Sequence, residues 1–179
     1  RGQLAVLLVG LDGFRLVNES FGHEAGDAVL QTIAGRLKDS LGNDIVVARH
    51  SGDEFLVKLR QTGGVDGATN VVREILASIA RPIEAGGQTT FVTASVGVAI
   101  FPDDGGDAPS LIKSAELALR DAKAAGAGTC RFFTAALNAR AQERAGLHSR
   151  LRSAIESDEI VPWYQPQIDT ISGKVIGAE

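Results

Sequence analysis

Two adjacent acidic residues, Asp53 and Glu54, lie where two apolar runs of the sequence meet. The stretch VARHSGDEFLVKL, residues 47–59, predicts two strands joined by a hairpin whose turn contains Ser51 and Gly52. Glycine with aspartate is ordinary hairpin chemistry, since glycine reaches positive φ without a steric penalty. Adjacent carboxylates at an exposed turn could also bind a divalent cation and a phosphorylated substrate. The local pattern therefore leaves a plain β-turn and a catalytic turn both open.

A second group of polar residues follows the first apolar run, which ends at Asp12. Asn18 and Asp27 flank a segment that we expect to turn at Gly22 and Gly26. If this segment meets the hairpin at one sheet edge, the Asp12 carboxylate joins both hairpin carboxylates in a cluster suited to Mg²⁺, which bridges phosphates in phosphoryl transfer. Asp27 or Asn18 could read the Watson–Crick edge of guanine. The alternative is that Asp27 caps a helix and Asn18 lies in a turn.

The composition limits the class of protein. The 179 residues are 44% hydrophobic and 22% charged, which predicts one well-buried domain with at most a short extra piece. A net charge of −4 argues against nucleic acid as a partner, and a single cysteine, Cys130, excludes a disulfide framework. No membrane span or signal peptide is visible, so we expect a cytoplasmic location for this part. The chain has no methionine and begins Arg-Gly, which favours a piece of a longer protein.

The positions of apolar residues predict the elements that must hold these side chains. Continuous or alternating apolar runs indicate strands, and stripes with helical spacing indicate amphipathic helices. We expect strands at 3–14, on both sides of Gly52, at 89–102 and at 128–133, and helices at 26–42, 67–82 and 108–126. Gly42 and Asp107 are candidate caps of the first and last of these helices. This order predicts an α+β or α/β sheet with helices packed against it.

The composition changes after Phe133. Residues 136–158 are rich in Ala, Arg and Glu, and their leucines are widely spaced, which predicts a solvated helical linker. Residues 159–179 then begin a new strand, turn at Ser172-Gly173 and begin another strand. We therefore expect a domain at 1–135, a linker, and the start of a second, truncated domain.

Four ordered motifs resemble the GGDEF family of diguanylate cyclases. They are LDGFRLVNESFGHEAGD, ARHSGDEF, ASVGVAIFP and LALRDAKAAG, and together they extend over about residues 1–135. The segment LRSAIESDEIVPWYQPQIDTISGKVIGAE is similar to the opening of an EAL domain, the phosphodiesterase of cyclic di-GMP, with Gln165 in its YQP segment. The resemblance implies a nucleotidyl-cyclase-like α+β sandwich with a central, mainly antiparallel five-stranded sheet flanked by helices. It also implies that the hairpin takes part in substrate and metal binding.

The resemblance assigns roles only where residues match. Asn18 and Asp27 match guanine-reading positions, and Arg15 and Lys123 match basic positions that meet the terminal phosphates of GTP. In the name motif, Asp53 matches an acidic ligand of Mg²⁺ (or Mn²⁺). The remaining motif residues implied in substrate binding or catalysis are Ser51, Gly52 and Glu54. Glu179 would be the first letter of the EAL motif and a metal ligand in that domain. Two such GGDEF domains, each holding one GTP, would form cyclic di-GMP as a homodimer.

Three departures from the family pattern fall at positions that handle metal and phosphate. Gly10 stands where the family usually has a second metal-binding aspartate, Ser51 replaces the first glycine of the name motif, and Ala127 replaces an arginine. Asp12 could replace the missing carboxylate, but residues i and i+2 of a strand are ~6.6 Å apart. The positions that correspond to the family's product-inhibition site hold Gly42 and Ile45, so this site is absent.

The pattern of matches and departures predicts a regulatory role. We expect a degenerate GTP-binding domain with little cyclase activity, attached to an EAL domain. Two alternatives stay open: a slow but active diguanylate cyclase, and a structural module for dimerisation or spacing.

Overall fold

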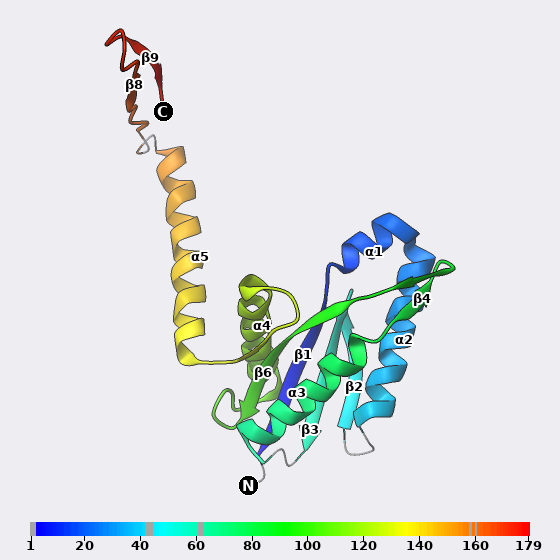
Figure 1. Ribbon diagram of the computed structural model, residues 1–179. Coiled ribbons are helices and arrows are strands. Elements are labelled where there is room, and N and C mark those ends of the chain that lie inside the picture. Colours follow the sequence, from blue (N-terminus) through cyan, green and yellow to red (C-terminus); the bar gives the residue numbers. More distant parts are fainter. Residues whose placement is uncertain (1–2, 42–44, 61–62, 158, 160) are drawn as a thin grey trace. The chain divides into compact units, whose positions relative to one another are not determined.

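The computed structural model describes residues 3–41, 45–60, 63–157, 159 and 161–179. The chain divides into two compact units, Arg1–Arg140 and Ala141–Glu179. The first unit contains most of the secondary structure, and α5 extends from it into the second (Figure 1). The elements, in chain order, are β1 (Leu4–Asp12), α1 (Phe14–Phe21), α2 (His23–Leu41), β2 (Ile45–Ser51), β3 (Glu54–Arg60), α3 (Val65–Ile79), β4 (Ile83–Ala85), β5 (Gln88–Thr90), β6 (Thr93–Phe101), α4 (Ala108–Ala125), β7 (Cys130–Phe132), α5 (Ala135–Glu156), β8 (Pro166–Ile168) and β9 (Val175–Ala178).

The first unit is built on a five-stranded sheet with the order β2-β3-β1-β6-β7. The central strand β1 pairs antiparallel with β3 and β6, and β2 pairs antiparallel with β3. Strand β7 runs parallel to β6, because α4 forms the crossover between them. The predicted α+β fold with a mainly antiparallel five-stranded sheet is confirmed, and its one parallel pair makes the sheet mixed.

The two faces of the sheet bury different side chains. Helices α2 and α3 lie along one face and α4 lies on the other (Figure 1). Because neighbouring side chains of a strand alternate between faces, the odd-numbered residues of β1 from Ala5 to Leu11 join the larger core with α2 and α3. Val6 and Leu8 join the smaller core under α4. The same alternation puts Gly10 and Asp12 on the α4 face.

Several predicted features are present in the structure. The apolar stripe of the first long helix, from Val29 to Leu41, is buried in the larger core. The Asp107 side chain accepts a hydrogen bond from the Ser110 amide at the start of α4, as its predicted capping role requires. The predicted cap at Gly42 lies outside the described residues.

The segment before the first long helix differs from the prediction. We expected a turn at Gly22 and Gly26, but residues Phe14–Phe21 form α1, and α2 already begins at His23. Gly22, at the junction, has a φ of 83°. Gly26 lies inside α2, and Asp27, four residues past the helix start, is not its cap. The second missed feature is the β4–β5 hairpin. Strand β4 lies between the predicted helix at 67–82 and the predicted strand at 89–102, and most of β5 was included in that strand.

The second unit comprises the C-terminal part of α5 and a small hairpin. Strands β8 and β9 pair antiparallel, and Gln165 and Glu179 exchange two backbone hydrogen bonds of 2.8 and 2.9 Å beside them. The chain is helical from Ala135 to Glu156, and the role of this helix as a linker stays a prediction. Among the helices of the described residues, none is both long enough and apolar enough to cross a membrane.

Candidate functional site

The hairpin between β2 and β3 lies at an exposed edge of the sheet, as predicted. Gly52 has a φ of 48°, a conformation that L side chains rarely adopt. Its carbonyl oxygen accepts hydrogen bonds from Nε and an Nη of Arg49, at 3.0 and 2.9 Å. The Asp53 carbonyl accepts from the Leu11 amide at 3.2 Å, which ties the turn to the end of β1. The turn is therefore fixed from both sides while its side chains stay accessible.

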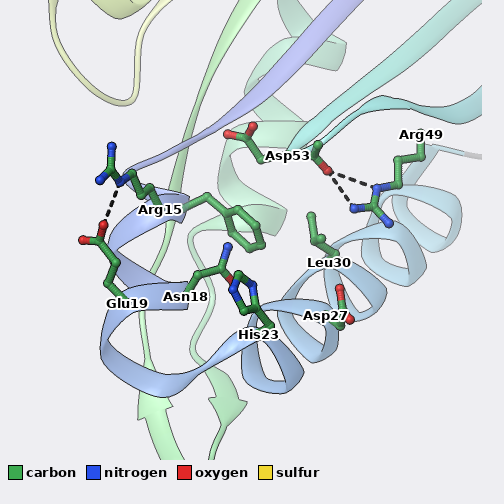
Figure 2. Close-up of a pocket in the computed structure, with 10 residues that line it drawn as sticks. Arg15, Asn18, Glu19, His23, Asp27, Leu30, Arg49 and Asp53 are labelled. Atoms are coloured by element: carbon green, nitrogen blue, oxygen red, sulfur yellow. Dashed lines mark hydrogen bonds and ion pairs between the residues drawn. The ribbon is translucent and has the colours of Figure 1, made fainter.

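One cavity of about 630 Å³ contains most of the predicted nucleotide-binding residues. It lies between the hairpin and the α1–α2 segment, and Figure 2 shows Asn18, Asp27 and Arg49 around it. Its lining residues are Phe14, Arg15, Asn18, Glu19, His23, Asp27, Leu30, Arg49, Gly52 and Asp53. The apolar side chains of Phe14 and Leu30 lie among polar and charged ones, and such a lining is suited to a planar base with hydrogen-bonding edges.

The position of Asn18 depends on a glycine in the neighbouring helix. A Cβ added to Gly26 would lie 1.9 Å from Asn18 Oδ1 and 3.2 Å from the Phe14 ring, so no larger residue fits without displacing the amide. From the sequence, this glycine was expected to form part of a turn. The structure shows instead that it allows α1 and α2 to pack closely beneath the cavity.

A second cavity, of about 260 Å³, lies on the α4 face of the sheet. Its lining residues are Leu8, Glu54, Glu116, Leu119, Arg120 and Lys123. Glu54 accepts a hydrogen bond from Ser51 Oγ at 3.3 Å, and Lys123 Nζ lies 3.8 Å from Glu54 Oε1. The consecutive residues Asp53 and Glu54 thus line different cavities.

Asp12, Asp53 and Glu54 do not form the expected cluster among the described residues, and the Asp12 carboxylate is engaged elsewhere. Its side chain accepts three hydrogen bonds of 2.8 Å each, from the hydroxyls of Thr93 and Ser95 and from the Gly128 amide. These donors tie β1 to β6 and to the loop before β7. These three donors from distant parts of the chain give the Asp12 carboxylate a role in the fold, which argues against it as a replacement for the carboxylate missing at Gly10.

The acidic residues of the hairpin do not form a cluster of metal ligands by themselves. Mg²⁺ is bound through oxygen ligands in near-octahedral geometry and commonly uses one or two carboxylates with substrate phosphates. Within the described ranges, no three Asp, Glu, His or Cys side chains come close enough together to hold a metal ion. Asp53 stays a predicted ligand, but Glu54 and Gly10 face the ammonium group of Lys123.

The two predicted phosphate-binding residues lie in different places. Lys123 lines the smaller cavity, whereas Arg15 lines the larger one, where its Nε donates a 2.7 Å hydrogen bond to Glu19. The Arg15 side chain is 90% exposed, so it is accessible to a ligand. Arg49 also lines the larger cavity, although the sequence pattern did not predict it as a site residue. Its place three positions before the turn glycine was the available signal.

Comparisons with known proteins identify the family of the first unit. The family model described as "Diguanylate cyclase, GGDEF domain" matches residues 1–129. The chain is 36% identical over 172 residues to the cyclic di-GMP phosphodiesterase NbdA of Pseudomonas aeruginosa, covering 96% of this chain and 22% of that protein. It is 34% identical over 177 residues to MucR, a bifunctional diguanylate cyclase/cyclic di-GMP phosphodiesterase of the same organism, covering 99% and 26% respectively.

A solved structure of a similar sequence has the same fold as the first unit. The GGDEF domain of TpbB (YfiN) from Pseudomonas aeruginosa superposes with a TM-score of 0.76 at 34% identity, covering 79% of this chain and 83% of that one. The chain spans only about a quarter of the length of the curated relatives it matches. Because the family model matches well over half of the chain, residues 1–129 belong to the GGDEF domain family of cyclic di-GMP signalling proteins.

Proposed function

We propose that this chain is a degenerate GGDEF domain that binds GTP as a regulatory ligand and makes little cyclic di-GMP. The observation that carries this proposal is that the site keeps the residues expected to recognise the nucleotide but lacks a carboxylate expected to bind the metal. Asn18 and Asp27 line a cavity large enough for a base, while Gly10 offers no carboxylate beside the hairpin. Recognition of the nucleotide and handling of a metal can therefore be lost independently.

The expected weakness in catalysis has a physical cause. Phosphoryl-transfer enzymes neutralise the charge that develops on phosphate with metal ions and fixed hydrogen-bond donors. Loss of one such contact typically costs about 10²–10³ in rate, and this chain departs from the family at Gly10, Ser51 and Ala127 together. Mg²⁺ or Mn²⁺, where it binds, would be held through Asp53 and would supply charge neutralisation at the phosphates.

Two other functions make different predictions. A slow diguanylate cyclase would convert GTP to cyclic di-GMP with Mg²⁺ or Mn²⁺, and robust turnover would refute the regulatory proposal. A purely structural module for dimerisation or spacing would be indifferent to changes at Asn18 or Asp27. The cavity lined by both residues favours the GTP-binding function over the structural one.

Isothermal calorimetry with GTP tests the binding. We expect GTP to bind more tightly than ATP, and Asp27→Ala to abolish this preference because the carboxylate accepts from guanine N–H donors. Glu24→Ala is the matched control, since Glu24 is an exposed acid on the same helix that does not line the cavity. Equal binding of GTP and ATP, or an unchanged Asp27→Ala variant, would favour the structural module.

The longer protein is proposed to carry an EAL phosphodiesterase domain after this one, with Glu179 as a metal ligand. Support comes from the resemblance of residues 159–179 to an EAL opening and from the names of the relatives, which include two cyclic di-GMP phosphodiesterases. A homodimer and a cytoplasmic location belong to the same proposal.

A further inference from the structure

The space beside the hairpin at Gly10 holds an ammonium group. A Cβ added to Gly10 would lie 2.7 Å from Lys123 Nζ and 2.8 Å from Lys123 Cε. Any side chain at this position would thus project into the end of the lysine. The glycine that removes the carboxylate also leaves the space that the end of the Lys123 side chain occupies.

Strand pairing brings the same ammonium to Glu54. Gly10 pairs directly with Glu54 across β1 and β3, and both face α4. Lys123 Nζ lies 3.8 Å from Glu54 Oε1, and the two side chains are 38% and 26% exposed. A fixed positive charge beside Glu54 repels a second cation, and the pair is partly shielded from solvent, which strengthens this repulsion.

A second cationic side chain lines the same cavity. Arg120 stands one helical turn before Lys123 on α4, so the two positions lie on neighbouring parts of one helix face. Of the acids in this cavity, Glu116 is 3.5 Å from His50 Nε2, and Glu54 also accepts from Ser51 Oγ. Both carboxylates thus have partners on β2, and Glu54 Oε1 also faces Lys123. Since an ammonium has three donors, Lys123 keeps donors for an incoming anion beside Arg120.

We propose that the Lys123 ammonium replaces the divalent cation at this site, so that the domain binds the polyphosphate of GTP without a metal ion. This inference rests on the proposed function, because it concerns the same nucleotide. An ammonium neutralises one charge and holds no water for chemistry, which suits a domain that binds a nucleotide and does not process it. Lys123 then serves as the phosphate-binding cation itself.

Calorimetry with GTP in EDTA and in excess Mg²⁺ tests the proposal on the whole chain. We expect the two dissociation constants to agree within about threefold, because no metal contributes to binding. If GTP binds with Mg²⁺ but at least about tenfold more weakly in EDTA, the inference is wrong and the proposed function survives. If GTP binds under neither condition, the proposed function fails as well.

Two lysine variants test whether Lys123 is the group that binds GTP in the absence of metal. Lys123→Met keeps the apolar stem and removes the charge, and we expect GTP affinity in EDTA to fall by about tenfold or more. Lys113→Met, an exposed lysine on the same helix that does not line this cavity, is the control and should leave affinity unchanged. Equal affinities of the two variants in EDTA, with unchanged circular dichroism, would overturn the proposal.

Gly10→Asp gives the opposite test. The new carboxylate would pair with the Lys123 ammonium and add a metal ligand, so binding should weaken in EDTA and recover with Mg²⁺. A Gly10→Asp variant that stays indifferent to Mg²⁺ would show that the lysine does not stand in for the metal. Circular dichroism checks that this variant folds.

Discussion

The position of the Asn18 side chain in the site depends on Gly26, which has no side chain. The amide is held at the cavity by close contact between α1 and α2, and Gly26 provides the room for it. A glycine inside a helix is usually unfavourable by about 0.8–1 kcal/mol relative to alanine. Its presence here is explained by the position of the amide and not by the stability of the helix.

Gly26→Ala should therefore weaken GTP binding without unfolding the domain. The added Cβ would displace Asn18 Oδ1, and the loss of about one hydrogen bond predicts a roughly three- to tenfold lower affinity by calorimetry. Gly35→Ala is the matched control, since a Cβ there meets nothing within 4 Å in the same helix. This control should keep its affinity and gain about 0.5–1 kcal/mol of stability in urea unfolding. Equal GTP affinities for both variants would contradict the assigned role of Gly26.

Among the elements, α4 and β6 approach each other unusually closely. A Cβ on Gly97 would lie 2.1 Å from the Ala115 carbonyl oxygen and 2.2 Å from the Leu119 amide nitrogen. Both contacts are with helix backbone, which cannot move away without shifting the whole of α4. Because Lys123 is carried by this helix, the glycine also determines how deeply the lysine reaches toward Gly10.

Gly97→Ala should destabilise the domain markedly. The helix must shift outward, and overpacking of this kind costs on the order of 1–3 kcal/mol in the free energy of unfolding. Gly106→Ala is the control, because a Cβ there meets nothing within 4 Å, and it should change stability by less than about 0.5 kcal/mol. Urea denaturation of both variants checks this, and a Gly97→Ala protein as stable as the control would show that α4 is loosely packed.

The start of α4 gives a pH-dependent prediction. Hydrogen bonds from Ser110 to the Asp107 carboxylate lower the pKa of that carboxyl from its ordinary value of 3.8. A depressed pKa in the folded state means that the stabilisation is present above 3.8 and is lost as the pH falls through the folded-state pKa. Asp107→Ala should therefore lower the melting temperature at neutral pH, and the difference from the unmodified chain should shrink as the pH falls below 3.8. A difference that does not change with pH would show that the charge makes no contribution to the cap.

At the scale of the whole molecule, the proposed GTP binding in the first unit raises the question of whether it affects the unit that follows. The boundary between the two units falls inside α5, so one continuous helix connects them. A ligand changes a linked domain only by its different affinity for two states of the protein. The typical coupling between two sites is about 1–3 kcal/mol.

The longer protein should therefore bind cyclic di-GMP with an affinity that GTP changes by about 5- to 150-fold. Calorimetry with cyclic di-GMP, with and without saturating GTP, measures this change, and Asp27→Ala should abolish it. A short glycine insertion in α5 should also abolish it while leaving GTP binding intact, because a broken helix transmits less strain. An effect that survives the insertion would refute α5 as the connection.

The sequence by itself determined the family and the main elements of the first unit, but not α1 or the β4–β5 hairpin. The apolar period of the first long helix, the alternation in β6 and the ordered motifs predicted the α+β fold correctly, because burial pattern and turn chemistry are local properties of the chain. The period of two in a strand also fixed that Gly10 and Asp12 share one face. Sequence reasoning failed where a residue's role depends on a partner far along the chain.

Only the tertiary structure decided which of the predicted site residues lie close to one another. Asp12 is occupied by donors 81 to 116 positions away, so it could not be assigned to a metal cluster or excluded from one by local pattern. Gly26 has the sequence signature of a turn and the structural role of a packing contact. Lys123 lies over Gly10 only because β1 and α4 pack face to face, and Gly97 permits that approach. These contacts link distant parts of the chain, and their distances follow from how the helices settle on the sheet.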